Sequence, residues 1–331
     1  MKILILADGN NEIGMGHVYR ELNLAKYLVK KKHKILFLTN QVISKKMISK
    51  KYDCIFSKNL QFKNTQNILK KFIPDLIILD KLNESKANIV LLSKLNPKIV
   101  GIDYIGKNKK FIPYGINYLY QKNGIKTNYS NFKFSILNQF FLKAKRIKIQ
   151  KEVKTIIILQ GGADTYCFTP KIIDSLNNIQ EKYKIIVVIG PAFRCWKDLE
   201  NSIDTSKNTV IVKHNVKNMV TLLKKADLAI TAAGNTLLEL ANLGIPSLVI
   251  CAERFENETA HHMETLGFGK NLGFGGDLSI EKITLEIRKI IQNYKFRKKM
   301  NLLGPRIIDG NGIKRVEKIF LKIVKNTCNN L

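Results

Sequence analysis

The sequence has no long run of hydrophobic residues. None of its segments reaches the roughly 18 consecutive apolar residues that a membrane-spanning helix needs. At the start, Met1 to Ala7 run directly into Asp8, without the charge pattern or the cleavage site of a signal peptide. We therefore expect a cytoplasmic protein with no stable membrane insertion.

Cysteine is also scarce. The five cysteines are odd in number, widely separated and never spaced as Cys-x-x-Cys: Cys54, Cys167, Cys195, Cys251 and Cys328. This pattern argues against a disulfide scaffold and against a structural zinc site. Cys167 as a lone nucleophilic thiol is one alternative, but a small buried apolar residue is the more common role of such a cysteine.

Arginine is rare although the sequence is strongly basic. Only eight of the 56 basic residues are arginine, and the lysines are dispersed from Lys2 to Lys325, with a formal net charge of +30. A nucleic-acid-binding protein usually concentrates arginine and aromatic residues in one region. The dispersed lysines instead indicate a codon bias, so we expect no nucleic-acid partner. The positive field should still attract anionic ligands and favour peripheral contact with membrane surfaces.

The sequence does contain a regular alternation of short apolar strands and amphipathic helices. Strands are predicted at residues 2–6, 34–39, 76–80, 98–102, 154–159, 185–189, 210–212, 228–231 and 247–250. Helical spacing is found at residues 17–30, 170–177, 219–225 and 237–243. Such alternation is typical of right-handed βαβ units and parallel sheets.

The length suits two domains of roughly 150 residues each. Residues 139–153 are charged and lack a strand pattern, so we place the linker there. The expected domains are residues 1–145 and 150–331, both Rossmann-like. A last helix at residues 312–324 has one apolar face, which must dock on another surface, and the N-terminal domain is one candidate.

The strongest local motif follows the first predicted strand. Gly14, Gly16, His17 and Arg20 form the pattern Gly-x-Gly-His-x-x-Arg at the sheet edge where ligands bind in open α/β folds. Glycines let backbone N–H groups approach a phosphate or sugar. The positive end of the helix dipole favours a neutral imidazole, which is the form that a general base needs. We predict that His17 is catalytic, against the alternative that it only caps the helix.

A second turn follows the first strand of the second half. Gly161 and Gly162 allow a close approach to a nucleotide, and Asp164 either contacts that nucleotide or caps the next helix. A third turn opens the helix at residues 237–243: Gly234, Asn235 and Thr236 present backbone amides suited to a diphosphate. Glu239, about one helical turn further on, can reach the two ribose hydroxyls.

A polar loop follows the strand at residues 247–250. Asn257 and Glu258 in this loop are candidates for contacts with sugar hydroxyls. His261 and His262 are adjacent and would point about 100° apart on a helix, so they do not easily chelate one metal ion. We predict neither a metal site nor a cofactor.

With these motifs the sequence resembles a family of nucleotide-sugar hydrolases and glycosyltransferases. The family includes the UDP-sugar hydrolase of pseudaminic acid biosynthesis and the spore-coat polysaccharide proteins. The resemblance covers most of the chain and rests on Asp8, Ile13, Gly14, Gly16, His17, Arg20, Leu79, Asp80, Asp103, Gly161, Gly162, Asp164, residues 235–239 and residues 257–260. The second half is also similar to the transferase that adds N-acetylglucosamine to lipid-linked peptidoglycan precursors.

The resemblance implies a GT-B fold, in which two Rossmann-like domains with parallel sheets face each other across a cleft and the second holds most of the UDP. It implies metal-independent chemistry on a UDP-sugar, with His17 as the general base that activates water to displace UDP with inversion. It also implies that the sugar side of the site includes Asp8, Gly14, Gly16, Arg20 and Asp80.

One departure from the family pattern affects the choice of function. The hydrolases have Asp-His-Tyr where this chain has Asp80, Lys81 and Leu82, so the family tyrosine is absent. We interpret Lys81 as one more surface lysine, with a cation offered to the diphosphate as the alternative. We expect a hydrolase of a UDP-linked diacetamido-trideoxyhexose, acting in pseudaminic-type nonulosonic acid or surface polysaccharide biosynthesis. An inverting glycosyltransferase with a UDP-sugar donor and a non-catalytic nucleotide-sugar-binding subunit are the alternatives.

Overall fold

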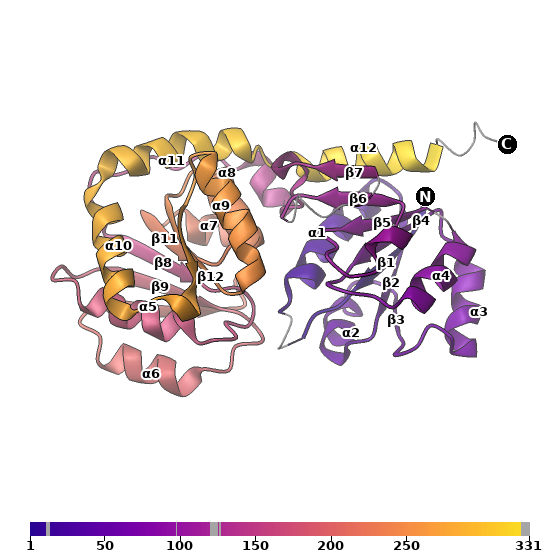
Figure 1. Ribbon diagram of the computed structural model, residues 1–331, viewed down its shortest axis with the longest axis horizontal. Helices are drawn as coiled ribbons and strands as arrows, with labels where there is room; N and C mark the ends of the chain where they lie inside the picture. The colour runs from indigo at the N-terminus through magenta and orange to yellow at the C-terminus, as the bar shows by residue number, and fades with distance from the viewer. Residues whose placement is uncertain (11–13, 97, 120–124, 126, 326–331) are drawn as a thin grey trace. The chain divides into compact units, whose positions relative to one another are not determined.

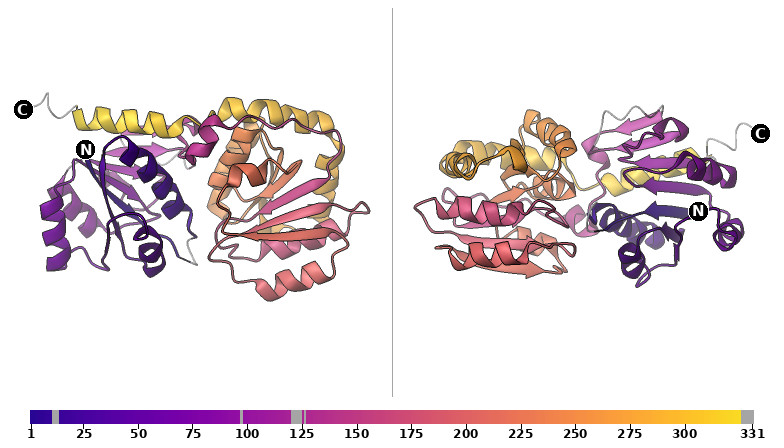
Figure 2. Two further views of the ribbon diagram at one scale, coloured as in Figure 1. Left: turned by 180° about the vertical axis from the view of Figure 1, so that it is seen from behind. Right: turned by 60° about the horizontal axis from the view of Figure 1, so that its bottom comes forward.

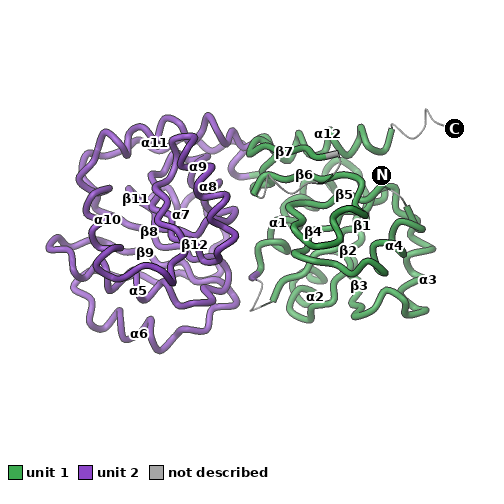
Figure 3. The backbone as a smooth tube through the Cα atoms, in the orientation of Figure 1, with its two compact units in different colours: residues 1–10, 15–139, 311–331 green, residues 11–14, 140–310 purple. Residues whose placement is uncertain are grey.

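The computed structural model describes residues 1–10, 14–96, 98–119, 125 and 127–325, and it divides into two compact units (Figures 1 and 3). Unit 1 contains the described residues of 1–10, 15–139 and 311–325. Unit 2 contains residues 140–310 together with Gly14. The division between residues 139 and 140 lies at the start of the linker predicted at residues 139–153.

Unit 1 is built on a seven-stranded parallel sheet in the order β3-β2-β1-β4-β5-β6-β7. The strands are β1 (Lys2–Ala7), β2 (Lys34–Thr39), β3 (Cys54–Phe56), β4 (Leu76–Asp80), β5 (Ile99–Ile102), β6 (Tyr114–Asn117) and β7 (Thr127–Ser130). Strand order reverses between β1 and β4, since the chain builds outward to β3 and then returns to the other side of β1. A reversal of this kind leaves a crevice at the carboxyl ends of the two central strands, where open α/β sheets bind ligands.

Helices cover both faces of this sheet (Figure 2). They are α1 (Gly16–Lys30), α2 (Val42–Ile48), α3 (Lys63–Phe72), α4 (Lys86–Leu95) and α12 (Gly312–Lys325), with short 3-10 helices at Lys109–Phe111 and Phe132–Phe134. Alternate strand residues such as Leu4, Leu36 and Ile77 pack in one apolar cluster with Leu69 of α3 and Leu92 of α4. The helix α1 contacts β1, β2, α2 and α12, and this arrangement places the first turn of α1 beside the switch point.

The last helix of the chain, α12, belongs to unit 1. Its apolar residues are buried: Ile313, Val316, Ile319, Phe320 and Ile323. The hydroxyl of Tyr27 on α1 donates to Glu317 at 2.8 Å, and Arg315 donates to the carbonyl of Lys133 at 3.0 Å. The chain therefore returns from unit 2 to complete the unit in which it began.

Unit 2 is a six-stranded parallel sheet in the order β10-β9-β8-β11-β12-β13. The strands are β8 (Thr155–Leu159), β9 (Lys184–Ile189), β10 (Thr209–His214), β11 (Leu228–Thr231), β12 (Ser247–Cys251) and β13 (Lys270–Phe274). The switch point lies between β8 and β11. Both central strands are almost wholly apolar and buried, as expected for strands covered on both faces.

The helices of unit 2 are α5 (Phe168–Asn177), α6 (Trp196–Asp204), α7 (Met219–Leu223), α8 (Asn235–Leu243), α9 (Asn257–Thr265), α10 (Ile280–Gln292) and α11 (Tyr294–Ile307). Short 3-10 helices occur at Gln139–Lys143, Arg254–Glu256 and Gly275–Asp277. The helix α5 packs with α6 and α10, and α8 packs with α11. Gly304 permits the close approach of α11 to α8, because a Cβ there would lie 2.5 Å from the carbonyl oxygen of Ala241.

The two parallel-sheet, Rossmann-like halves confirm the α/β class predicted from sequence. The structure adds elements that the hydrophobic pattern did not reveal, among them β3, β6, β7 and β13, which are short or only partly buried. Within the described residues, no helix combines the length and the apolar character that crossing a bilayer would require.

Candidate active site

His17 and Asp80 form the centre of the polar cluster in unit 1. The chain turns after β1, and Gly14 adopts φ +74°, a conformation that favours glycine. The helix α1 then begins at Gly16, which places His17 in its first turn. Asp80 ends β4 in register with Ala7 at the end of β1. The Nδ1 atom of His17 consequently lies 2.6 Å from Oδ1 of Asp80.

The contact between the two side chains assigns the proton on the imidazole. An ionised carboxylate only accepts hydrogen bonds, so Nδ1 of His17 must donate to Asp80. The pKa of Asp80 is shifted to well below its usual range: burial alone would raise it, but Arg20 and His17 together outweigh burial. With the proton on Nδ1, the lone pair of the ring lies on Nε2, the atom required of a base. The His17 side chain retains 11% exposure, whereas Asp80 has none.

Arg20 is the cation that balances this buried site. Its Nε donates to Oδ2 of Asp80 at 2.7 Å and its Nη2 donates to Oδ1 of the same carboxylate, which makes the pair bidentate. Its Nη1 donates to Asp103 at 2.5 Å and to the hydroxyl of Tyr118 at 3.2 Å. Burial opposes the charge of Arg20, but Asp80, Tyr118 and Asp103 overcome that effect and raise its pKa.

Asp103 links the guanidinium to the backbone beyond β6. The residue has φ +45°, and its Oδ1 accepts from the backbone N–H groups of Tyr118 at 2.8 Å and Leu119 at 2.9 Å. Burial raises the pKa of Asp103, while Arg20 and these N–H groups oppose the rise. Of the residues that sequence assigned to the sugar side, Arg20 and Asp80 thus surround and orient His17.

Asp8 lies in a second cluster, paired with a lysine that sequence analysis treated as a surface residue. Lys81 is 4% exposed, and its Nζ lies 2.7 Å from Asp8 and 2.8 Å from Glu84. Asp8 also accepts from the hydroxyl of Thr39 at 2.7 Å and from the N–H of Asn40 at 3.1 Å. The preferred interpretation of Lys81 as a surface lysine is wrong, because the strand end carries its side chain inward between two carboxylates.

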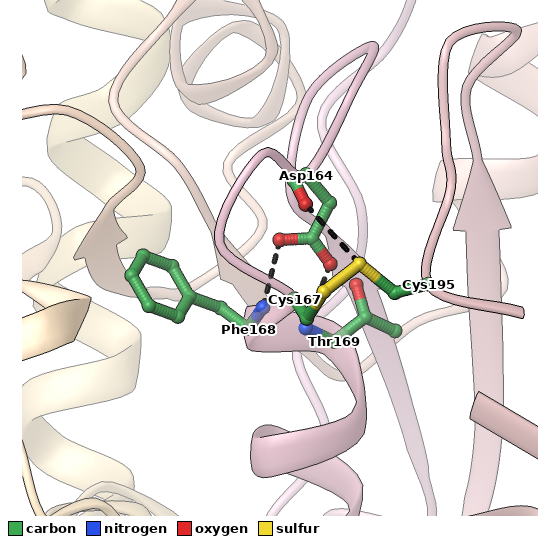
Figure 4. Close-up of a disulfide and its surroundings, with 5 residues drawn as sticks. All are labelled: Asp164, Cys167, Phe168, Thr169 and Cys195. Atoms are coloured by element: carbon green, nitrogen blue, oxygen red, sulfur yellow. Dashed lines mark hydrogen bonds between the residues drawn. A yellow bond between two sulfur atoms is a disulfide. The ribbon is translucent and has the colours of Figure 1, made fainter. Parts of the chain in front are cut away.

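In unit 2, the turn after β8 is held by Asp164 (Figure 4). Gly161 has φ +77°, and the carboxylate of Asp164 accepts from the N–H groups of Phe168 and Thr169, both at 2.8 Å. This is the capping role considered for Asp164, and it fixes the start of α5. A Cβ on Gly190 would lie 2.3 Å from the carbonyl oxygen of Gly162, so the turns after β8 and β9 are in close contact.

A disulfide joins these same two turns and corrects the expectation that the chain has none. Cys167 and Cys195 are bonded, with their Cα atoms 5.7 Å apart, and each precedes a helix of unit 2 (Figure 4). Cys167 is therefore not a free nucleophile in this structure. Sequence spacing did not predict the bond, because the two residues are 28 positions apart and meet only through the pairing of β8 with β9.

The start of α8 combines a glycine turn with two partly buried carboxyls. Glu256, which sequence analysis did not select, accepts from the N–H of Ala252 at 2.8 Å and of Ala233 at 3.3 Å, next to Gly234. Burial raises the pKa of Glu256 to about 7 and that of Glu239 to about 8. Asn235, the first residue of α8, has a buried Oδ1 without a hydrogen-bond partner among the described residues.

Gln160 is a further buried polar group at the edge of the sheet of unit 2. It directly follows β8, is 2% exposed, and neither atom of its amide has a partner within the described ranges. Asn257 and Glu258 are exposed at the start of α9, where Asn257 accepts from Asn271 at 2.8 Å. Across the described part of the chain, no three His, Cys, Asp or Glu side chains are grouped as a metal site requires.

These features define the class of protein to which the chain belongs. Two parallel-sheet halves with polar turns at both switch points are the GT-B glycosyltransferase-like fold, and solved structures agree. The fold is similar to that of MurG from Acinetobacter baumannii, with a TM-score of 0.67 and 12% identity over 97% of this chain and 99% of that one. The spinosyn forosaminyltransferase SpnP gives a TM-score of 0.66 and 13% identity over 97% and 99% of the chains.

Residues 132–302 match the glycosyltransferase family 28 C-terminal domain, and the chain belongs to this family. Among curated relatives, the protein MJ1062 of Methanocaldococcus jannaschii is 31% identical over 290 residues, 78% of this chain and 57% of that protein. The chain thus spans little more than half the length of that relative. The spore coat polysaccharide biosynthesis protein SpsG of Bacillus subtilis is 28% identical over 96% of this chain and 97% of its own length.

A third relative is a Bacillus cereus transferase, the UDP-N-acetylglucosamine–N-acetylmuramyl-(pentapeptide) pyrophosphoryl-undecaprenol N-acetylglucosamine transferase 1. It is 24% identical over 57% of this chain and 54% of its own length. The match to family 28 covers nearly all of unit 2, which contains the two turns that sequence analysis assigned to nucleotide binding.

Proposed function

We propose that the protein is an inverting glycosyltransferase that takes a UDP-sugar donor during the assembly of a surface polysaccharide. Membership of glycosyltransferase family 28 supports transfer chemistry. The UDP-N-acetylglucosamine transferases among the relatives support UDP as the nucleotide. The relative named for spore coat polysaccharide biosynthesis is similar over nearly the whole of both chains, which supports the pathway class.

The observation that carries the mechanism is the 2.6 Å contact between His17 and Asp80. In the proposed reaction, Nε2 of His17 takes the proton of an acceptor hydroxyl as its oxygen attacks the anomeric carbon. The bond from that carbon to the diphosphate oxygen breaks, and its electron pair leaves with UDP. Asp80 stabilises the imidazolium that forms, and Arg20 fixes the orientation of Asp80 by its bidentate contact.

Unit 2 would hold the nucleotide. The glycine turn at Gly161 and Gly162 and the backbone amides at the start of α8 suit a diphosphate, and Glu239 would contact the ribose. The unpartnered amide groups of Gln160 and Asn235 support a polar ligand at this sheet edge. In this proposal Asp164 acts by shaping the turn, and the exposed Asn257 and Glu258 would contact sugar hydroxyls.

A UDP-sugar hydrolase is the second candidate, and the cluster around His17 favours it. That cluster brings together His17, Arg20, Asp80 and Asp103, all of which belong to the pattern shared with the hydrolases. Water would then replace the acceptor hydroxyl. Leu82, which stands where the hydrolases have tyrosine, counts against this alternative.

Measurement of UDP release separates these functions. The purified protein is given UDP-N-acetylglucosamine and related UDP-amino sugars, with and without a panel of monosaccharide and lipid-phosphate saccharide acceptors. Release that depends on an acceptor supports the transferase, whereas enzyme-like release without acceptor supports the hydrolase. Calorimetry with UDP, CMP and GDP tests the nucleotide, and tight UDP binding without any turnover would indicate a non-catalytic binding subunit.

Substitution of His17 tests the mechanism. Removing a general base should lower kcat by about 10²- to 10⁴-fold in His17→Ala. Asp80→Asn should cost about 10- to 100-fold, because the imidazolium loses a charged hydrogen-bond partner. His214→Ala is the matched control, because His214 is exposed in unit 2, and its rate should equal that of the wild type. A His17→Ala protein with an unchanged rate would remove His17 from the reaction.

A further inference from the structure

Glu21 is a buried carboxyl beside the cluster at His17 that the proposed reaction does not use. It follows Arg20 on α1 and lies one helical turn after His17, so that both side chains project from the same side of the helix. Glu21 has no exposed surface, and within the part of the chain that the structure describes no donor reaches either of its carboxyl oxygens. The carboxylate of Asp80, which can only accept, lies within hydrogen-bonding reach of it. Its neighbours Arg20, Asp80 and Asp103 all have partners.

An ionised Glu21 would be costly at this place. A buried carboxylate needs a cation or several donors, and the guanidinium of Arg20 is already engaged by Asp80 and Asp103. The charged groups that face Glu21 are Asp80 on β4 and Arg20 on its own helix. Burial raises the pKa of Glu21 to well above its usual value, Asp80 raises it further, and Arg20 opposes the rise without reversing it.

The neutral state also fits the charge of the cluster. With Glu21 protonated, Arg20 balances one of the two carboxylates Asp80 and Asp103, and one negative charge remains. When His17 accepts a proton, that charge is cancelled. With Glu21 ionised, the cluster would stay negative even after His17 becomes an imidazolium, in a site with little water to screen the charge.

We propose that Glu21 is a positioning residue, held as the neutral carboxylic acid, that donates its proton to Asp80 and thereby fixes the carboxylate that orients His17. Asp80 then receives donors from three directions: His17, Arg20 and Glu21. The role of Glu21 in turnover rests on the proposed function, because it acts only through His17. Its protonation state does not depend on that function and can be measured without any substrate.

Infrared difference spectroscopy tests the protonation state directly. The spectrum of wild type minus Glu21→Gln at neutral pH should show the carbonyl stretch of a protonated carboxyl group. Glu286→Gln is the matched control. Glu286 is a 7% exposed carboxyl whose pKa is lowered by Lys289 and Lys282, so it is ionised at neutral pH. The spectrum of wild type minus Glu286→Gln should therefore lack the band of a protonated carboxyl group. Absence of the band from the Glu21 difference spectrum would overturn the proposal.

Kinetics of UDP release test the positioning role. Glu21→Leu should lower kcat about 10- to 100-fold with a nearly unchanged KM for the donor, because Asp80 loses one of its donors. Glu21→Gln should restore most of kcat, since a neutral amide still donates to Asp80. In Glu21→Gln, the decline of kcat at alkaline pH should begin at a higher pH than in the wild type, because an amide does not ionise. An unaltered kcat in Glu21→Leu, or an unshifted alkaline decline in Glu21→Gln, contradicts the role.

The two experiments separate the two proposals. If the wild type releases no UDP from any donor, the proposed function fails while the infrared result still decides whether Glu21 is protonated. If the wild type is active and the band is missing, the inference about Glu21 fails and the proposed function stands. The Glu21→Gln protein keeps the test decisive even if Glu21→Leu does not fold.

Discussion

The disulfide between Cys167 and Cys195 should contribute a large share of the stability of unit 2. The bond closes a loop with a sequence separation of 28 residues. In the chain-entropy model a crosslink across a loop of this length stabilises the folded state by about 3.6 kcal/mol at 25 °C, through restriction of the unfolded chain. The double variant Cys167→Ser with Cys195→Ser should lose approximately that amount.

The single tryptophan provides the assay. Trp196 is the only tryptophan in the sequence and follows Cys195 directly, with its ring edge-to-face on Phe193 at a centroid distance of 5.0 Å. Its fluorescence therefore reports the unfolding of unit 2. If the free energy of unfolding falls by about 2 kcal/mol for each molar increase in urea, the unfolding midpoint of the double variant should lie about 2 M below that of the wild type. Cys54→Ser, in unit 1, is the control and should leave this midpoint unchanged.

Two results would refute the reasoning. Reduction of the denatured chain should raise the number of alkyl groups that it accepts by two. Equal labelling before and after reduction would show that the bond is absent from the protein in solution. A midpoint that does not move with reductant, in a protein shown to carry the bond, would instead contradict the stabilisation derived from loop closure.

Two further predictions concern the ionisable side chains Arg20 and Glu239. Arg20→Met should destabilise unit 1 by about 3–5 kcal/mol in thermal unfolding, because Asp80 and Asp103 are left buried without their cation; a variant as stable as the wild type would contradict this. In unit 2, Glu239 has its pKa raised to about 8 from an ordinary value of 4.5, so the folded state binds more protons than the unfolded state between these pH values. The free energy of unfolding reported by Trp196 fluorescence should therefore fall as pH rises from about 5 to 8. Glu239→Gln should make this decline shallower. An identical decline in the variant would show that Glu239 does not cause it.

The sequence predicted the two parallel sheets because their central strands are continuous apolar runs. The central strands β1, β4, β8 and β11 are buried on both faces, and their predicted bounds lie within one or two residues of the observed ones. Three of the four edge strands, β3, β7 and β13, were missed, whereas the edge strand β10 was predicted in part. In β13, for example, every residue is only partly buried, so Lys270 and Asn271 interrupt the hydrophobic pattern by which strands are recognised.

The disulfide and Lys81 show a different limit of sequence analysis. Cys167 and Cys195 follow different strands, and their meeting depends on the neighbouring positions of β8 and β9. A lysine among many lysines gives no sign of burial. Lys81 is enclosed between Glu84, three residues further along the chain, and Asp8, which follows β1 in a different segment. In both cases the residue type is visible in the sequence, while its partner is determined by tertiary structure.

The cluster around Arg20 could be predicted in part from the strand pattern, while the rest is determined by tertiary structure. In a parallel sheet all carboxyl ends share one edge, so the placement of His17, Asp80 and Asp103 at that edge follows from the strand pattern alone. Their pairing requires the order β1-β4-β5, which the chain achieves by crossing back from β3 over two strands. A glutamate on a helix is ordinarily a solvated charge. The strand order makes Glu21 an exception, because it determines the protonation state of this residue. Only the pairing of β4 with β1 brings Asp80 under α1, and the buried carboxylate there makes the neutral form of Glu21 the stable one.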